Sequence, residues 1–278
     1  MSEGALARGV QTLEATSDSP RLDAELLLAH VLDCDRRQLR SRSAEPLSET
    51  AQSTFEALIL RRTHGEPIAY LIGHWDFWTL TLRVTPAVLV PRPETELLVE
   101  LALSTMTDKV APTVLDLGTG SGAVGLAIAS ERADASIDLT DASEAALEIA
   151  RLNCSLLGYS HVQLHQGTWL EAVPGRSYDV IVANPPYLAS TDPHLATPAL
   201  GFEPLQALVA GPSGLADLKQ IANTAAAHLK AAGSLYLEHG YEQGVAVRTL
   251  LTDAGFSAVT THRDLAGLER VTSGVRPD

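Results

Sequence analysis

The tetrapeptide Asn184-Pro185-Pro186-Tyr187 carries the side chains best placed for chemistry. It follows the short apolar run 178–183, in which β-branched residues predict a buried strand. Two prolines then end the strand, because neither can donate a ladder hydrogen bond and each fixes its own φ. The pattern predicts an amide side chain held by a stiff loop at the carboxyl end of a strand, where open parallel sheets bind ligands.

An amide in this position suits methylation of a planar NH₂ group, whose own lone pair is delocalised. The side-chain carbonyl of Asn184 and the backbone carbonyl of Pro185 can accept the two hydrogens and turn the lone pair toward a methyl donor. Positioning of this kind supplies much of the catalysis without a strong base. Tyr187 would pack on the flat face of the substrate group. We therefore interpret Asn184, Pro185 and Tyr187 as catalytic residues.

A glycine-rich turn lies upstream, where the expected strand Thr113–Leu117 is followed by Gly118-Thr119-Gly120-Ser121-Gly122. Glycines let the backbone turn sharply and approach a ligand closely. The next expected strand ends at Asp141, about the spacing at which an acid contacts a ribose diol. Dinucleotide sites and S-adenosylmethionine sites share this arrangement.

Two observations favour S-adenosylmethionine over a dinucleotide. The turn from Gly118 does not follow the dinucleotide spacing G-x-G-x-x-G, although the segment 120–125 formally does. Asp116, at the end of the first strand, would attract a cationic ligand and disfavour a pyrophosphate. Trp169 follows the third expected strand and could cover an adenine ring; a place in the core is an equally good interpretation.

The alternation of strands and helices from residue 113 onward predicts βαβ units in a doubly wound, mostly parallel sheet. The whole chain is therefore predicted to contain a helical domain over 1–72, a β-hairpin linker over 73–90 with an apolar strand at Val88–Val90, and a catalytic domain over 91–278. Ser19 and Ser48 are candidate helix caps. We expect strands at Thr113–Leu117, Ser136–Thr140, Val162–Gln166, Tyr178–Ala183, Gly233–Leu237, Ser257–Thr261 and Arg270–Ser273, and helices at Ala123–Glu131, Glu144–Leu156, Ala216–Lys230 and Gln243–Ala254.

Composition sets limits on the partners. The 278 residues are 45% apolar and 19% charged, with a net charge of −14, which counts against a nucleic-acid substrate. No apolar run approaches the length of a membrane span, and the start lacks a signal peptide, so we expect a cytoplasmic protein with no membrane partner. Cys34 and Cys154 have no ligand cluster beside them and are read as buried thiols, with no metal site. No long apolar surface stripe demands a dimer, so we expect a monomer.

With these motifs placed, the sequence resembles the PrmC/HemK family, the S-adenosylmethionine-dependent enzymes that methylate the glutamine side chain of peptide-chain release factors. The Asn-Pro-Pro-Tyr motif is shared with adenine-N6 methyltransferases. The segment 91–96 together with Phe202-Glu203-Pro204 is much more specific to the PrmC/HemK family. The resemblance spans nearly the whole chain and includes the segments 65–73, 91–96, 116–122, 184–187, 202–204, 238–240 and 264–267.

The resemblance implies a Rossmann-like methyltransferase fold, a helical amino-terminal domain and a Gly-Gly-Gln motif of a class I release factor as substrate. Gly118, Thr119, Gly120, Ser121, Gly122, Asp141, Trp169 and Asn184 would bind the cofactor, and Asn184, Pro185, Pro186 and Tyr187 would hold the glutamine. The alternative is a nucleic-acid adenine methyltransferase, which predicts a basic groove and an inserted recognition region. A non-catalytic protein of the same fold is a third interpretation, and the intact Asn184 and glycine turn argue against it.

Overall fold

The computed structural model describes residues 2–42 and 44–278, and the chain forms two compact units. The first comprises Met1–His74 together with Pro193–Phe202, and the second comprises Trp75–Asp192 and Glu203–Asp278. The division at 74 falls inside the segment that we expected as a linker. The sequence did not indicate that the later segment 193–202 belongs with the amino-terminal helices.

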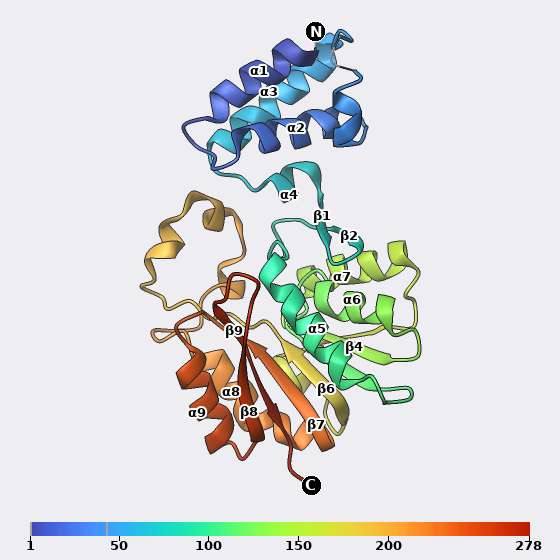
Figure 1. The fold of residues 1–278 in the computed structure, drawn as a ribbon, viewed down its shortest axis with the longest axis vertical. Helices are drawn as coiled ribbons and strands as arrows, with labels where there is room; N and C mark the ends of the chain where they lie inside the picture. The colour runs from blue at the N-terminus through green and yellow to red at the C-terminus, as the bar shows by residue number, and fades with distance from the viewer. Residues whose placement is uncertain (1, 43) are drawn as a thin grey trace. The chain divides into compact units, whose positions relative to one another are not determined.

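Helices build the first unit, in which α1 (Ser2–Leu13), α2 (Pro20–Val31) and α3 (Glu49–Thr63) lie side by side (Figure 1). Ser48 caps α3, since its hydroxyl accepts the N–H of Ala51 at 3.1 Å. Ser19 stands at the N-cap position of α2 but makes no cap bond; its hydroxyl donates to Asp23 at 3.2 Å. The remaining elements are α4 (Ile68–Ile72), η1 (Arg36–Leu39), η4 (Pro193–Ala196) and η5 (Pro198–Phe202).

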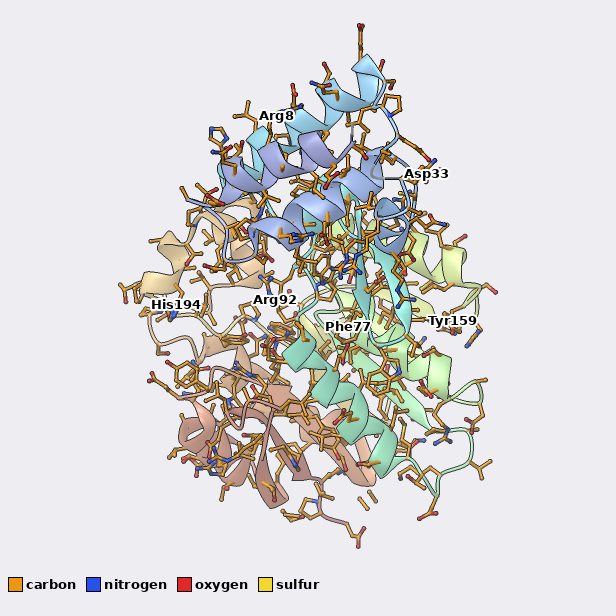
Figure 2. The ribbon with its side chains drawn as sticks, turned by 45° about the horizontal axis from the view of Figure 1, so that its top comes forward. Arg8, Asp33, Phe77, Arg92, Tyr159 and His194 are labelled. Carbon is orange, nitrogen blue, oxygen red and sulfur yellow. The ribbon has the colours of Figure 1, made fainter. Side chains whose placement is uncertain are left out.

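A hairpin of β1 (His74–Phe77) and β2 (Leu80–Arg83) forms where the second unit begins, as the alternating pattern predicts, and only its first residue, His74, is counted with the first unit. Phe77 is 2% exposed and projects from the hairpin into the core (Figure 2). The strand expected at Val88–Val90 is wrong, because these residues join no sheet. The N–H of Val90 donates instead to the Glu203 carboxylate at 3.1 Å, so a side chain takes the place of a neighbouring strand.

The main sheet has seven strands in the order β5-β4-β3-β6-β7-β9-β8. Pairing is parallel except for β9, which runs antiparallel to β7 and to β8. The doubly wound, mostly parallel sheet is therefore confirmed. The strands are β3 (Thr113–Leu117), β4 (Ser136–Asp141), β5 (Gln163–Gln166), β6 (Tyr178–Ala183), β7 (Leu229–Glu238), β8 (Ser257–Arg263) and β9 (Glu269–Val275).

Helices cover both faces of the sheet, and each face has its own core (Figure 1). Successive strand side chains point to opposite faces, so Val114 joins the core under α5, α6 and α7, while Leu115 joins the core under α8 and α9. The central strands are therefore apolar on both sides. The helices are α5 (Glu96–Thr105), α6 (Ala123–Glu131), α7 (Glu144–Leu157), α8 (Ala216–Ala225) and α9 (Gly244–Asp253), with single turns η2 (Pro93–Thr95), η3 (Trp169–Ala172), η6 (Leu205–Ala207) and η7 (Ala226–His228).

One predicted helix is too long. The expected helix Ala216–Lys230 ends as α8 at Ala225, and β7 already begins at Leu229. Leu229 pairs with Tyr178 of β6, so pairing in the sheet overrides the helical propensity of this alanine-rich segment. Cys154 is buried as expected, whereas Cys34 is only partly covered. Within residues 2–42 and 44–278, no helix is both long and apolar enough to cross a membrane.

Candidate active site

A cavity of about 290 Å³ opens at the carboxyl ends of β3, β4 and β6, and all the residues that line it belong to the second unit. Its volume lies near the lower end of the roughly 300–1,000 Å³ of small-molecule sites. The cavity gathers most of the side chains predicted for the site. Those lining it are Gly118, Thr119, Gly120, Ser121, Asp141, Trp169, Asn184 and Pro186; Gly122, Pro185 and Tyr187 do not line it.

The glycine turn joins β3 to α6 along one wall of the cavity. Gly118 has φ +68° and Gly120 has φ +55°, a left-handed conformation that glycine adopts without a steric penalty. A Cβ on Gly118 would lie 3.1 Å from the Trp169 ring, whereas a Cβ on Gly120 would meet nothing within 4 Å. The turn therefore packs against Trp169 at one glycine and leaves open space at the next.

Asp141 ties the end of β4 to this turn. One carboxylate oxygen, Oδ2, accepts the N–H of Gly120 at 2.9 Å, and Oδ1 accepts the N–H of Ser143 at 2.9 Å. Burial raises the pKa of Asp141, and these backbone donors oppose the rise. Each oxygen keeps a second lone pair, so the carboxylate can still accept hydrogen bonds from a diol.

Asp116 stabilises the glycine turn through hydrogen bonds. Its Oδ2 accepts the Thr119 hydroxyl at 2.6 Å and the N–H of Gly125 at 3.0 Å. Burial raises the pKa of Asp116 to about 6, and the two hydrogen bonds oppose that rise. Asp116 is thus first a support for the glycine turn, and it adds a carboxylate near the cavity.

Trp169 is fixed by a partner that the sequence did not reveal. Its indole Nε1 donates to Asp217 of α8 at 3.2 Å, and its backbone has φ +49°. Asp217 also lines the cavity. In the sequence, Asp217 stands out only as an acid in the first turn of a helix. Acids are common there because they interact favourably with the helix dipole, so this position gave no sign of a functional role.

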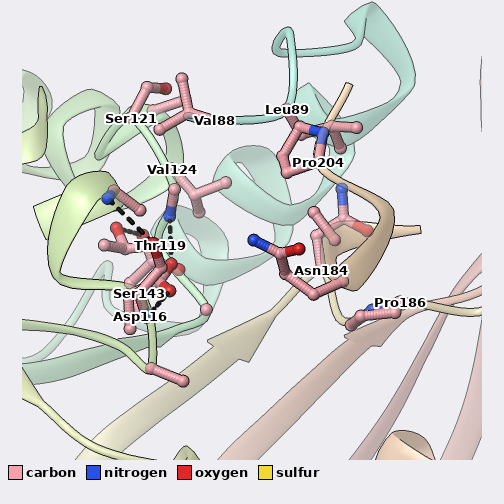
Figure 3. Close-up of a pocket in the computed structure, with 18 of the residues that line it drawn as sticks. Val88, Leu89, Asp116, Thr119, Ser121, Val124, Ser143, Asn184, Pro186 and Pro204 are labelled. Carbon is pink, nitrogen blue, oxygen red and sulfur yellow. Dashed lines mark hydrogen bonds between the residues drawn. The ribbon is translucent and has the colours of Figure 1, made fainter. Parts of the chain in front are cut away.

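Asn184 lies at the end of β6, across the cavity from Asp116 and Thr119 (Figure 3). Its side-chain Nδ2 donates to the hydroxyl of Thr95 at 3.2 Å. Tyr187 packs against the core under α8 and α9, and burial raises its pKa to about 12. Its backbone carbonyl accepts Nε2 of Gln243 at 3.0 Å, which holds the proline loop from outside the cavity.

The segment before α5 forms another wall. Arg92 makes an ion pair with Glu203, whose side chain is 1% exposed and also accepts the N–H of Val90. Arg92 and Thr95 line the cavity, and so does Gln206. Thr95 and Gln206 were missed in the sequence, because a threonine beside acidic residues and a glutamine after a proline have no distinctive spacing.

The donor set of the cavity fits S-adenosylmethionine better than a dinucleotide. Asp116, Asp141 and Asp217 contribute three carboxylates, and Arg92 is the one cation among the described lining residues. Glu203 already pairs with that arginine, so a pyrophosphate would find no free positive side chain among them. A cationic ligand with a ribose diol would instead meet acceptors. No three histidine, cysteine or acidic residues gather as metal ligands in the described part of the chain.

Two family models match the chain: the PrmC N-terminal domain over residues 4–73 and the methyltransferase small domain over residues 94–199. The release factor glutamine methyltransferase of Xylella fastidiosa strain Temecula1 is 51% identical over 263 residues, covering 95% of this chain and 96% of that protein. The enzyme of the same name from Coxiella burnetii is 46% identical over 261 residues, covering 94% of each.

The fold itself is shared more widely. The crystal structure of a methyltransferase from Pyrococcus furiosus superposes with a TM-score of 0.55 at 19% identity, covering 81% of this chain and all of that one. Such distant likeness concerns the methyltransferase fold alone. The high identity over nearly the full length of the bacterial proteins is what shows the family. The chain belongs to the release factor glutamine methyltransferase family.

Proposed function

We propose that this protein transfers a methyl group from S-adenosylmethionine to the side-chain amide nitrogen, N5, of the glutamine in the Gly-Gly-Gln motif of class I peptide-chain release factors, and so modulates translation termination. The names of its relatives support this substrate. The observation that carries the chemistry is the meeting of Asn184 with the glycine turn and Asp141 around one cavity.

The residues that would hold the cofactor follow from the geometry of the cavity. S-adenosylmethionine, when bound, supplies an electrophilic methyl group on a sulfonium centre. Asp141 would accept the ribose hydroxyls through its remaining lone pairs, and the open backbone of Gly120 would allow close approach. Trp169 would cover a face of the adenine ring. The carboxylates of Asp116 and Asp141 favour a positively charged ligand.

Asn184 and Pro185 would orient the substrate amide. The Asn184 carbonyl accepts one hydrogen of the NH₂ group and the Pro185 backbone carbonyl accepts the other, so that the nitrogen lone pair faces the methyl donor. Pro186 and Tyr187 keep the loop stiff and complete the glutamine site. The nitrogen becomes acidic once it carries the methyl group, so its extra proton leaves without a strong base. Positioning within reach of the donor is the main contribution of the protein.

The setting of the reaction follows from its substrate. We place the enzyme in the cytoplasm, where release factors act, and assign it a monomeric state with no nucleic-acid partner. Residues 1–72 would assist in recognising the release factor, residues 73–90 would link them, and residues 91–278 would carry the catalytic site.

Transfer of a labelled methyl group tests the proposal. The protein is incubated with labelled S-adenosylmethionine and a release factor, its Gly-Gly-Ala variant, or DNA. We expect label in the intact release factor alone. Label in DNA, or equal label in the Gly-Gly-Ala variant, would refute the substrate assignment.

Asn184→Ala tests the orienting amide in the same assay. It should keep cofactor binding and lose most of the turnover, because the cavity remains but one acceptor for the substrate NH₂ is gone. Asn223→Ala, at an exposed position on α8, is the matched control and should retain activity. Unchanged turnover in Asn184→Ala would contradict the role of this side chain.

A further inference from the structure

A buried chain of polar side chains runs from Asn184 away from the cavity. The Nδ2 group of Asn184 donates to the Thr95 hydroxyl at 3.2 Å. Burial raises the pKa of the Glu238 carboxyl group, and hydrogen bonding from the Thr95 side chain opposes that rise. Thr95 is 4% exposed and Glu238 is 1% exposed. One carboxylate oxygen of Glu238, Oε2, is buried with no hydrogen-bond partner among the described residues.

The chemistry of these groups determines which of them donates and which accepts each hydrogen bond. An ionised carboxylate can only accept hydrogen bonds, so Glu238 obliges the Thr95 hydroxyl to donate its single proton toward it. The Thr95 oxygen is then left as an acceptor and holds the NH₂ end of the Asn184 amide. The carbonyl end of Asn184 remains available as an acceptor for a substrate NH₂ group.

We infer that Thr95 and Glu238 are positioning residues, which fix the direction of the Asn184 amide so that its carbonyl serves the substrate. The inference rests on the proposed function, because it concerns the same methyl transfer. It also gives a role to two segments of the chain that no other part of the mechanism uses, the acidic turn before α5 and the carboxyl end of β7. Glu238 does not line the cavity, and Thr95 acts through its hydrogen bond with Asn184.

Without its charge, Glu238 would no longer fix the direction in which the Thr95 hydroxyl donates, and so would no longer fix the orientation of the Asn184 amide. A protonated carboxyl group can donate to Thr95, whose proton is then free to point at Asn184 and hold the amide in the opposite orientation. The charged and titratable groups that face Glu238 are Arg270 on β9, Arg92 and Glu94 before α5, and Tyr187 after β6. Burial raises the pKa of Glu238 to about 7, opposed by Thr95 and Arg270, so the switch falls within an accessible pH range.

Steady-state kinetics with the full chain and a release factor test Thr95. Thr95→Val keeps the shape but removes the hydroxyl, and we expect kcat to fall about tenfold with KM unchanged, as for an interaction that matters in the transition state. Thr95→Ser restores the hydroxyl and should recover most of the rate. Thr105→Val, which removes the hydroxyl bonded to Tyr236 at the far end of α5, is the matched control. Equal rates in Thr95→Val and the control would overturn the inference.

The pH dependence tests Glu238. The wild-type kcat should fall as the pH drops through about 7, because protonation of Glu238 lets the Asn184 amide adopt the opposite orientation. Glu238→Gln should be about tenfold slower at pH 8 and should lack this limb, since its carboxamide does not titrate. A limb near pH 7 that persists in Glu238→Gln would assign the titration to another group and contradict the role of Glu238.

The side-chain amide resonance of Asn184 gives a test that needs no substrate. Its ¹H–¹⁵N signals, assigned with Asn184→Asp, should shift with a midpoint near pH 7 in the wild type and stay constant in Glu238→Gln. A constant signal in the wild type would overturn the inference even if methylation occurs. A titrating signal in a protein that fails to methylate any release factor would refute the proposed function and leave the positioning chain intact.

Discussion

Alanine substitutions at two glycines of the same turn should differ in effect: one should mainly weaken cofactor binding, and the other should mainly lower the free energy of unfolding. Gly120 and Gly122 both have positive φ, +55° and +86°. A Cβ on Gly120 would meet nothing within 4 Å, whereas a Cβ on Gly122 would lie 2.9 Å from Cδ1 of Leu126. Gly120 lines the cavity and Gly122 does not. Substitution of Gly120 therefore tests contact with the ligand, and substitution of Gly122 tests packing of the turn.

The expected magnitudes follow from these environments. The left-handed backbone costs an alanine roughly 1–2 kcal/mol at either position. Gly122→Ala also crowds Leu126, which adds roughly 1–3 kcal/mol of overpacking. We expect the free energy of unfolding to fall by roughly 1–2 kcal/mol for Gly120→Ala and by roughly 2–5 kcal/mol for Gly122→Ala. The new methyl group at Gly120 should weaken cofactor binding about tenfold or more, a loss of about 1.4 kcal/mol or greater.

Urea unfolding and calorimetric titration with S-adenosylmethionine measure the two quantities on the same preparations. Gly122→Ala should bind the cofactor within about threefold of the wild type at a temperature where it is folded. The reasoning is refuted if Gly120→Ala destabilises as much as Gly122→Ala, or if Gly120→Ala binds the cofactor with unchanged affinity.

Two further substitutions probe single carboxylates. Asp141→Asn should raise the calorimetric Kd for S-adenosylmethionine by roughly 10–100-fold, since it removes charged acceptors worth about 1.5–3 kcal/mol each; a change below twofold would exclude a ribose contact. Burial alone would raise the pKa of Asp179, but hydrogen bonds from Lys230 and Thr113 hold it well below its usual range. Its stabilisation is therefore present above about pH 4 and lost as the pH falls further. Asp179→Asn should lower the free energy of unfolding in urea by about 2 kcal/mol at pH 7 and by less at pH 3. An equal loss at the two pH values would contradict the lowered pKa of Asp179.

Much of the fold is visible in local patterns. The strands β3 and β6 and the helix α6 match their predicted bounds, because each is a short apolar segment with a glycine or a proline close to at least one of its ends. The prediction erred where a distant partner decides the conformation. Val88–Val90 is apolar and carries two β-branched valines, yet the N–H of Val90 donates to the Glu203 carboxylate and that of Val88 to the Thr85 carbonyl, rather than to another strand. The end of α8 was misplaced because Leu229 belongs to the pairing of β7 with β6.

The sequence by itself determined the chemistry that the site can hold. Amide, glycine turn and acid are local signals, since each depends on residue type and on its place at a strand end. Their meeting in one cavity follows from the parallel strand order β4-β3-β6, which brings three carboxyl ends to the same edge of the sheet. That much was predictable from the alternation of strands and helices.

The tertiary structure alone decided which side chains support that chemistry. Asp217 holds Trp169 across 48 positions of sequence, and Thr95 holds Asn184 across 89. Glu238 lies in a segment that resembles the family, but the sequence assigned it no role, and only its burial beside Thr95 led us to propose one. Such contacts leave no periodic trace, because a hydrogen bond needs one donor and one acceptor that the fold brings together from unrelated segments.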